Sequence, residues 1–238
     1  TGTVFATTKI AEKIWKNPEK VEEFYGANGE RIENEEYEIW HSKNINTNNY
    51  ENIISEKDAE AQINQILKKF GYSEEDIELV KIAGFMHDIG NVVNRKHHAE
   101  YGAILANEIL KKTDMSMKDR ITVVSAIGHH DESTGGATDP VSAALIIADK
   151  TDVRRNRVRE KAKENFDIHD RVNYAVTDAA LKINIDKKVI ALNLQIDTSI
   201  CSMYEYFDIF LGRMMMCRGA AGILGATFKL TANGSKVL

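Results

Sequence analysis

The sequence predicts a mainly α-helical fold with a small α+β subdomain at the C-terminus. Between residues 55 and 152, apolar residues recur at helical spacing in five segments, most of which begin with capping residues. Beyond residue 166, two stretches alternate between apolar and polar side chains with the period of a β-strand. We therefore expect an N-terminal helix and irregular segment over 1–54, an all-α helical core over 55–165, and an α+β subdomain over 166–238.

The composition is that of a globular protein, with 43% hydrophobic residues among 238 and a formal net charge of −5. The acidic balance argues against general nucleic-acid binding. The basic run between Arg154 and Lys163 is expected to be a solvated helix face, and local RNA binding is the weaker alternative.

No apolar run reaches the ~18 residues that a membrane span requires, and the first residues lack the features of a signal peptide. We therefore expect a cytoplasmic protein without a membrane partner. The two cysteines, Cys201 and Cys217, predict buried thiols in a reducing compartment rather than a disulfide framework.

The first 54 residues carry few structural signals. The motif Asn17-Pro18-Glu19 predicts a helix start, and the helix would run through Val21 and Phe24 to Tyr25. The segment that follows, 26–54, is polar and is expected to be a loop.

The core is predicted to contain five helices. Ser55, Ser73, Ser116 and the pair Asp139-Pro140 provide N-terminal caps for four of them, and the remaining helix begins near His98. The expected helices run from Ser55 to Phe70, Ser73 to the doublet His87-Asp88, His98 to Leu110, Ser116 to Gly128 and Val141 to Asp152. The last is apolar almost throughout and is expected at the centre of the core.

The C-terminal subdomain is predicted to combine two antiparallel hairpins with one helix. The first hairpin covers 181–196, a helix follows over 202–224, and Asn233-Gly234 is a strong turn signal for the second hairpin. We expect an antiparallel sheet of up to four strands with the helix packed on it. The apolar, Met-rich stretch 203–216 fits either a homodimer interface or a buried helix of a monomer.

Imidazole and carboxylate side chains gather at the predicted helix ends. They are His87, Asp88, His98, His129, His130 and Asp149. Each alone has a plain structural explanation, but their joint order favours a metal site. This mixture suits Mn, Fe, Co, Ni or Mg better than structural Zn, which favours Cys. One or two such ions would activate water and orient a phosphate ester. Lys150 is the expected phosphate contact, and Asp131 is a candidate acceptor for the proton.

The segments LVKIAGFMHDIGN, HHAEYGAILANEIL, AIGHHDESTG and AALIIADKTDVRRNRVR resemble, over about residues 55–155, the HD-domain superfamily of metal-dependent phosphohydrolases. The last three, with FDIHDRVNYAV and the C-terminal hairpins, are similar to a group of stand-alone bacterial HD proteins described only as predicted phosphohydrolases. The resemblance implies one or two divalent ions per chain, with Zn among the options. It implies that His87, Asp88 and Asp149 are ligands of one ion, and that His98 and His130, with His129 as an option, bind a second.

The sequence departs from the family pattern at one position. Family members carry a histidine at the start of the helix before the doublet, where this chain has Ser55; the nearest upstream histidine is His41. Two hypotheses follow. The first is metal-dependent hydrolysis of a small phosphorylated substrate such as a nucleotide. The second is a nucleotide-binding or regulatory protein that keeps the scaffold with a weakened site.

Overall fold

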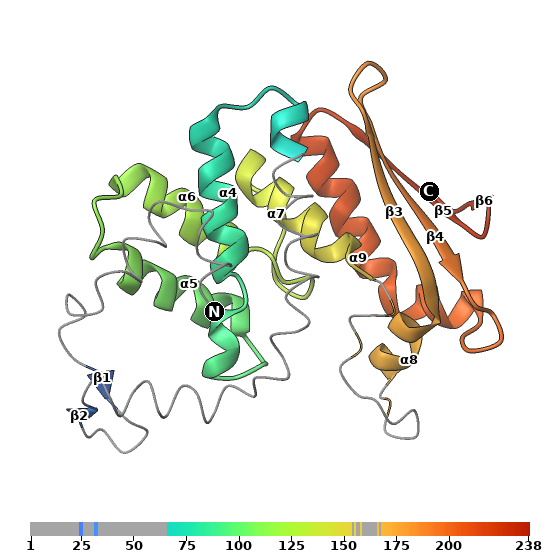
Figure 1. The fold of residues 1–238 in the computed structure, drawn as a ribbon, viewed down its shortest axis with the longest axis horizontal. Coiled ribbons are helices and arrows are strands. Elements are labelled where there is room, and N and C mark those ends of the chain that lie inside the picture. The colour runs from blue at the N-terminus through green and yellow to red at the C-terminus, as the bar shows by residue number, and fades with distance from the viewer. Residues whose placement is uncertain are drawn as a thin grey trace. The chain divides into compact units, whose positions relative to one another are not determined.

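A computed structural model describes residues 66–153, 155, 158, 166 and 168–238, together with the backbone of two short strands, β1 (Phe24–Tyr25) and β2 (Arg31–Ile32) (Figure 1). The chain divides into two compact units, Thr1–Lys57 and Asp58–Leu238.

In the first unit, β1 and β2 pair antiparallel, with Phe24 opposite Ile32. The predicted helix through Phe24 and Tyr25 is therefore wrong at these two residues. Aromatic and β-branched side chains favour extended backbone, and this preference prevails here over the helix signal upstream. The helix predicted from Ser55 lies outside the described residues except for its end, where Ile66 and Leu67 are fully buried.

The helices of the core are α4 (Glu74–Met86), the 3₁₀-helix η4 (Ile89–Val92), α5 (His98–Leu110), α6 (Met117–Gly128) and α7 (Pro140–Thr151). Three predicted caps are confirmed. The Ser73 hydroxyl accepts from the Asp76 N–H, and the Asp76 carboxylate accepts from the Ser73 N–H. Ser116 and Asp139 cap α6 and α7 in the same position. Local side-chain chemistry thus fixes where these helices begin.

Helix α7 lies at the centre of the second unit, as its apolar sequence predicts. Its residues from Val141 to Ala148 are all buried, and α4, α6 and α9 (Met203–Ile223) pack against it. Figure 1 shows α7 between α4 on one side and α9 on the other. Asp149 and Lys150 therefore emerge from the middle of the core rather than from its edge.

The C-terminal sheet has the order β3-β4-β5-β6. It follows helix α8 (Ile168–Ala175) and consists of β3 (Val176–Asn184), β4 (Val189–Ile196), β5 (Thr227–Ala232) and β6 (Ser235–Lys236). The pairs β3–β4 and β5–β6 are antiparallel hairpins, as predicted.

The expectation of a wholly antiparallel sheet is wrong at one junction, because β4 and β5 pair parallel. Helix α9 connects the two strands and carries the chain back across the sheet, so β5 starts again from the end where β4 started. The alternating buried residues Ile190, Leu192 and Leu194 of β4 and Phe228 and Leu230 of β5 form the inner face, which α9 covers.

Both predicted thiols, Cys201 and Cys217, are free and buried. Among the described residues, no helix combines the length and the hydropathy that a membrane span needs.

Candidate metal centre

The doublet His87-Asp88 lies in a tight turn at the end of α4. His87 follows the last helical residue, and Asp88 precedes η4. A Cβ atom added at Gly90 would overlap the main-chain oxygen of His98 and approach Gly102. The absence of a side chain at Gly90 therefore lets the turn lie directly against the start of α5, which brings Asp88 and His98 together.

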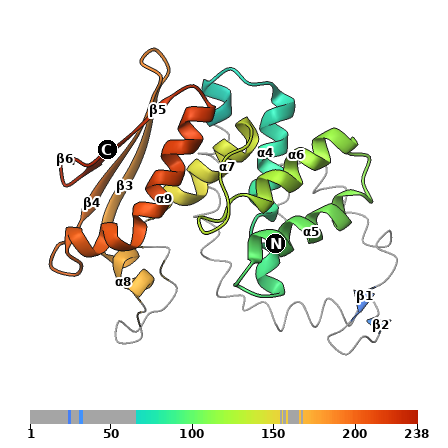
Figure 2. The ribbon, with the colours of Figure 1, turned by 180° about the vertical axis from the view of Figure 1, so that it is seen from behind.

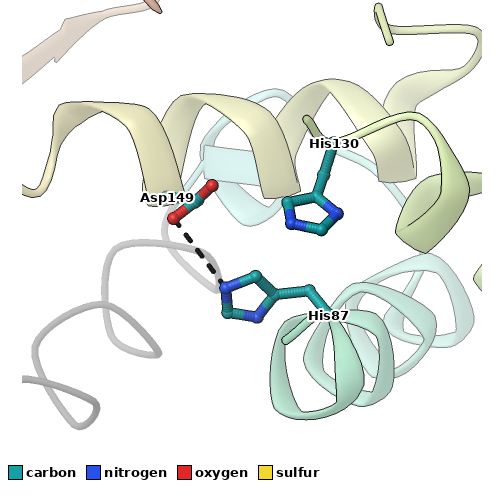
Figure 3. A group of neighbouring side chains, drawn as sticks. All are labelled: His87, His130 and Asp149. Carbon is teal, nitrogen blue, oxygen red and sulfur yellow. Dashed lines mark ion pairs between the residues drawn. The ribbon is translucent and has the colours of Figure 1, made fainter. Parts of the chain in front are cut away.

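One group of possible metal ligands consists of His87, His130 and Asp149, from three different parts of the core (Figure 3). One ligand atom of each lies within 4.8 Å of the others. The His87 Nε2 atom is 3.8 Å from Asp149 Oδ1, and the His87 and His130 rings meet edge to face with centroids 5.0 Å apart.

A second group consists of Asp88, His98 and His130. The His98 Nε2 atom lies 3.4 Å from Asp88 Oδ1 and 3.1 Å from His130 Nε2. His130 belongs to both groups, and Asp88 also lies 3.7 Å from His87 Nε2 through its other oxygen, Oδ2. The two groups are therefore one continuous cluster with room for one ion or two adjacent ions.

Hydrogen bonds fix which ring nitrogen is free to bind an ion. The Nδ1 atoms of His87, His98 and His130 lie 2.6, 3.1 and 2.6 Å from the main-chain oxygens of Gly84, Arg95 and Ile127, respectively. Because a carbonyl oxygen only accepts, Nδ1 carries the proton in each neutral ring and Nε2 presents its lone pair. Imidazoles anchored in this way are typical metal ligands.

The donor set fits a divalent cation. Burial lowers the pKa of His130, and the neighbouring His87 lowers it further, to about 4, so its ring is neutral near pH 7. The Nε2 atoms of His98 and His130 face each other at 3.1 Å in a buried position, where two lone pairs would repel. Only a proton or a metal cation relieves that repulsion, and the nearby carboxylates of Asp88 and Asp149 supply the negative charge that a divalent ion requires.

Both carboxylates are held ionised. Burial alone would raise the pKa of Asp149, but the adjacent Lys150 ammonium lowers it, and its net pKa lies well below the ordinary value. Burial would also raise the pKa of Asp88, and the His87 ring lowers it to a net value below the ordinary one. The site thus presents charged oxygen ligands at neutral pH.

A chain of ion pairs leads from this cluster to α9. The Lys150 ammonium lies 2.8 Å from Asp149 Oδ2 and 2.7 Å from Glu132 Oε2, and Arg213 Nε donates to Glu132 Oε1 at 2.9 Å. Burial would lower the pKa of Lys150, but its two carboxylate partners raise it. The Arg213 guanidinium also lies over the Phe210 ring, 4.5 Å from its centre. Asp149 is therefore held through Oδ2 while Oδ1 faces His87.

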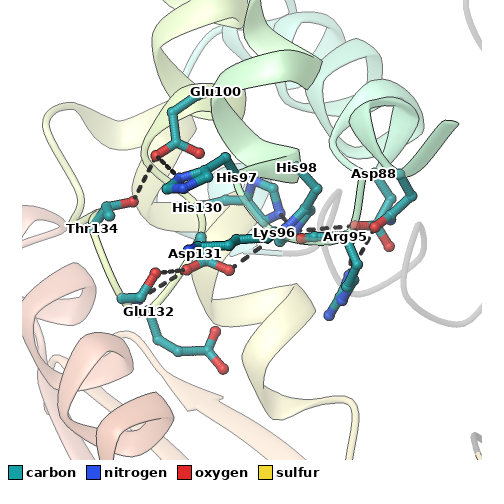
Figure 4. Close-up of polar contacts among 12 residues, drawn as sticks. Asp88, Arg95, Lys96, His97, His98, Glu100, His130, Asp131, Glu132 and Thr134 are labelled. Atoms are coloured by element: carbon teal, nitrogen blue, oxygen red, sulfur yellow. Dashed lines mark hydrogen bonds and ion pairs between the residues drawn. The ribbon is translucent and has the colours of Figure 1, made fainter. Parts of the chain in front are cut away.

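Around the second group lie further polar contacts (Figure 4). Asp131 accepts hydrogen bonds from the Ser133 N–H and hydroxyl, and its Oδ2 lies 3.7 Å from His98 Nδ1. Burial would raise the pKa of Asp131, but the Ser133 bonds lower it, and the net pKa is lowered. On the outer side, Arg95 is 71% exposed with its Nη1 atom 3.7 Å from Asp88 Oδ1. The cluster thus opens to solvent beside an exposed basic side chain, whose Nη1 atom also donates to Asn91 Oδ1 at 3.2 Å.

Five of the six predicted ligands come together, and one does not. His129, the optional ligand, belongs to neither group: its Nδ1 atom lies 2.9 Å from the Ser125 main-chain oxygen, and its side chain is exposed. Lys150 lies at the cluster, yet its ammonium already has two carboxylate partners. Ser55 and His41 lie outside the described residues.

Sequence reasoning assigned no functional role to Glu132, Arg213, Arg95 or Gly90. A signal existed for two of them. Glu132 extends the run His129-His130-Asp131, and Arg213 is a single charge between Phe210 and three consecutive methionines, where an unpaired guanidinium would be costly.

Comparison with known proteins yields one family and a few partial relatives. A family model described as HD domain matches residues 53–178, more than half of the chain. An uncharacterized protein of Methanocaldococcus jannaschii is 32% identical over 108 residues, which span 42% of this chain and 41% of that protein. Ribonuclease Y of Enterococcus faecalis and of Latilactobacillus sakei are each 32% identical over 95 residues, or 39% of this chain and only 17% and 16% of theirs. No solved structure gave a significant match.

Proposed function

Because the chain belongs to the HD-domain family, a superfamily of metal-dependent phosphohydrolases, we propose that it hydrolyses a phosphate ester with bound divalent metal. The observation that carries the proposal is the cluster of three imidazoles and two carboxylates in which two possible ligand groups share His130. The side chain of Asp88 is 49% exposed, so a ligand from solution can reach the cluster.

Two overlapping ligand sets are proposed. His87, His130 and Asp149 would hold one ion, and Asp88, His98 and His130 would hold a second or share the first. A divalent cation, when bound, lowers the pKa of water and neutralises charge on a phosphate group. The Nδ1 hydrogen bonds of the rings keep Nε2 directed into the cluster, and Lys150 keeps Asp149 Oδ1 directed at His87.

The two basic residues near the cluster, Lys150 and Arg95, have different proposed roles. We propose that Lys150, the residue expected to contact phosphate, acts first as a positioning residue, because both of its short contacts are to carboxylates of the chain, those of Asp149 and Glu132. Arg95 is the better candidate for the phosphate contact, since its guanidinium is exposed and lies beside Asp88 at the open side of the cluster. An arginine there can form two parallel hydrogen bonds with phosphate oxygens.

Asp131 remains the candidate acceptor for the proton released on hydrolysis. Its carboxylate is ionised and lies next to His98. Its lowered pKa makes it a weak base, so we expect a contribution smaller than that of the metal ligands.

The substrate class is a phosphorylated metabolite or nucleotide. Two relatives are ribonucleases by name, which favours a phosphodiester bond over a phosphomonoester. The matched segment is a small part of those enzymes, so their RNA substrates are not assumed for this chain.

The test measures hydrolysis of the phosphodiester bis(p-nitrophenyl) phosphate and of the phosphomonoester p-nitrophenyl phosphate. A panel of nucleotides follows, and each substrate is assayed in Mn²⁺ and in EDTA. We expect product release to require metal, and its rate to fall at least about 100-fold in Asp88→Asn and in His98→Gln. His97→Ala is the matched control, because His97 pairs with Glu100 on the surface and belongs to neither ligand group. Release that persists in EDTA or in both site variants would refute the assignment.

The second candidate, a nucleotide-binding or regulatory protein without turnover, rests on Ser55 in the place of the family histidine. It predicts saturable nucleotide binding with no product from any ester in the panel. Turnover that requires His87 and Asp88 would exclude it.

A further inference from the structure

The outward side of α9 carries a row of exposed residues, here called the stripe: Tyr204, Asp208, Leu211, Met215, Arg218 and Gly222. Tyr204 is 81% exposed, and Leu211 and Met215 are 44% and 45% exposed. Asp208, Arg218 and Gly222 lie exposed on the same side. The opposite side of the helix, with Tyr206, Phe210, Met214 and Cys217, is buried against the core and the sheet. Figure 2 views the molecule from the side on which α9 lies in front of the sheet.

Three exposed glycines of α9, Gly222 in the stripe and Gly212 and Gly219 beside it, have no explanation within the described chain. A Cβ atom added at Gly212, Gly219 or Gly222 would have no neighbour within 4 Å. Each glycine inside a helix costs about 1 kcal/mol relative to alanine. A glycine with open space around it is useful where another backbone or a bulky side chain approaches closely. The outer face of α9 therefore has the properties of a contact surface.

The stripe is symmetric in sequence about Arg213. Leu211 and Met215 lie two residues on either side of it, Asp208 and Arg218 lie five, and Tyr204 and Gly222 lie nine. At about 100° per residue, all six fall within roughly 40° of the direction opposite Arg213. Among the described residues, neither Asp208 nor Arg218 has an ion-pair partner.

We propose that this face of α9 binds the same face of a second copy of the chain, antiparallel and about a two-fold axis. In that arrangement each residue of the stripe meets the residue equally far from Arg213 in the other copy. Asp208 lies level with Arg218 of the second copy, Leu211 packs on Met215, and the Tyr204 ring lies over Gly222. Opposite charges meet on both sides of the centre, and the largest side chain of the stripe meets the smallest at each end.

The alternatives are less well matched. A parallel pairing in register would set Asp208 against Asp208 and Arg218 against Arg218. What favours a second copy over an unrelated partner is that Asp208 and Arg218 lie equally far from Arg213 and carry opposite charges, which an antiparallel copy complements. The helix is 21 residues long, or about 31 Å, and one helix pair gives an interface at the small end of specific contacts, below about 1,200 Å² in total. The dimer is therefore expected to be reversible.

Sedimentation equilibrium of the full chain, from about 1 to about 200 μM, tests the proposal. The wild type should show a monomer–dimer equilibrium with a micromolar dissociation constant. Asp208→Arg alone, or Arg218→Asp alone, creates two like-charge contacts per dimer and should weaken association by at least about tenfold. The double variant should restore it, and so should an equimolar mixture of the two single variants.

Lys182→Asp is the matched control, because Lys182 is an exposed charge on β3, away from the stripe. Circular dichroism and the melting temperature of each variant check that the chain is folded. A wild type that stays monomeric over the whole concentration range would overturn the proposal. A dimer whose dissociation constant is the same in the wild type and in both single charge-reversal variants would also overturn it. None of these measurements depends on metal or turnover, so a failure of the dimer proposal can be distinguished from a failure of the proposed hydrolase function.

Discussion

The Nε2 atoms of His98 and His130 face each other at 3.1 Å, while the Nδ1 atom of each ring is engaged by a main-chain oxygen. Both side chains are buried, and the low pKa of His130 keeps its ring neutral near pH 7. At this distance two lone pairs would repel, so the pair needs either a proton on one Nε2 atom or a metal cation. The fold thus holds a pair of imidazoles in a geometry that a cation stabilises.

Replacement of His130 should impair metal binding more than replacement of any other ligand, because His130 belongs to both groups. We expect His130→Ala to lower Mn²⁺ affinity at every site by at least about tenfold. His87→Ala should spare the set formed by Asp88 and His98. Isothermal titration with Mn²⁺ measures both, with His97→Ala as control. Equal behaviour of His130→Ala and the control would contradict the shared-ligand geometry.

Loss of the Lys150 ammonium should destabilise the protein strongly. Lys150→Met leaves the largely buried Asp149 carboxylate without its ammonium partner, at a cost of about 3–5 kcal/mol, while the exposed Glu132 keeps Arg213. Lys111→Met removes an exposed pair with Glu108 and should cost less than about 1 kcal/mol. Urea denaturation of the two variants gives the comparison. Similar small losses in both would mean that the Lys150 pairs contribute little to stability.

Gly90→Ala should separate the two halves of the second ligand group. The new methyl group would collide with the His98 main-chain oxygen, so the turn that carries Asp88 must move away from α5. We expect lower stability and weaker metal binding together. Gly136→Ala, where a Cβ meets nothing within 4 Å, is the control. Calorimetric melting with and without Mn²⁺ reports both effects, and a Gly90→Ala protein that matches the control would count against this contact.

Acid should destabilise the EDTA-treated protein through His130. Its folded pKa is lowered to about 4 from an unfolded value near 6.5. The stabilising effect of the neutral ring is complete above pH 6.5 and is lost as the pH falls toward 4, because the unfolded chain takes up a proton that the folded chain excludes. The loss is on the order of 3 kcal/mol.

The lowered pKa values of Asp88 and Asp149 act in the same direction but at lower pH, below their ordinary value of 3.8. Urea denaturation between pH 7 and pH 4 measures the slope due to His130. The His130→Gln variant should have a flatter profile in this window, and an unchanged slope would show that another group is responsible.

Much of the helical core could be predicted because its signals are local. The caps at Ser73, Ser116 and Asp139 and the apolar run of α7 involve residues within one or two helical turns. The parallel pairing of β4 with β5 could not be predicted in this way. It depends on the path of α9 across the sheet, which no short window of sequence contains.

The same distinction between local and long-range signals applies to the candidate metal site. The residue types at the helix ends predict a metal cluster, but the choice between His129 and His130 depends on how the end of α6 is turned toward α7. The pairing of Glu132 with Arg213 joins residues 81 positions apart. Only the packing of α9 beside α7 brings them together, so the support behind Asp149 was not visible in the sequence.

The most direct test of the metal centre is elemental analysis of protein purified without chelator or metal-affinity resin, beside the His130→Ala variant, followed by titration of both with Mn²⁺. We expect one or two equivalents of a divalent metal in the wild type, either retained on purification or bound on titration, and a clear loss in the variant. A wild type that carries no metal and binds no Mn²⁺ would contradict this expectation, and the cluster around His130 would then be a structural core of histidines rather than a metal centre.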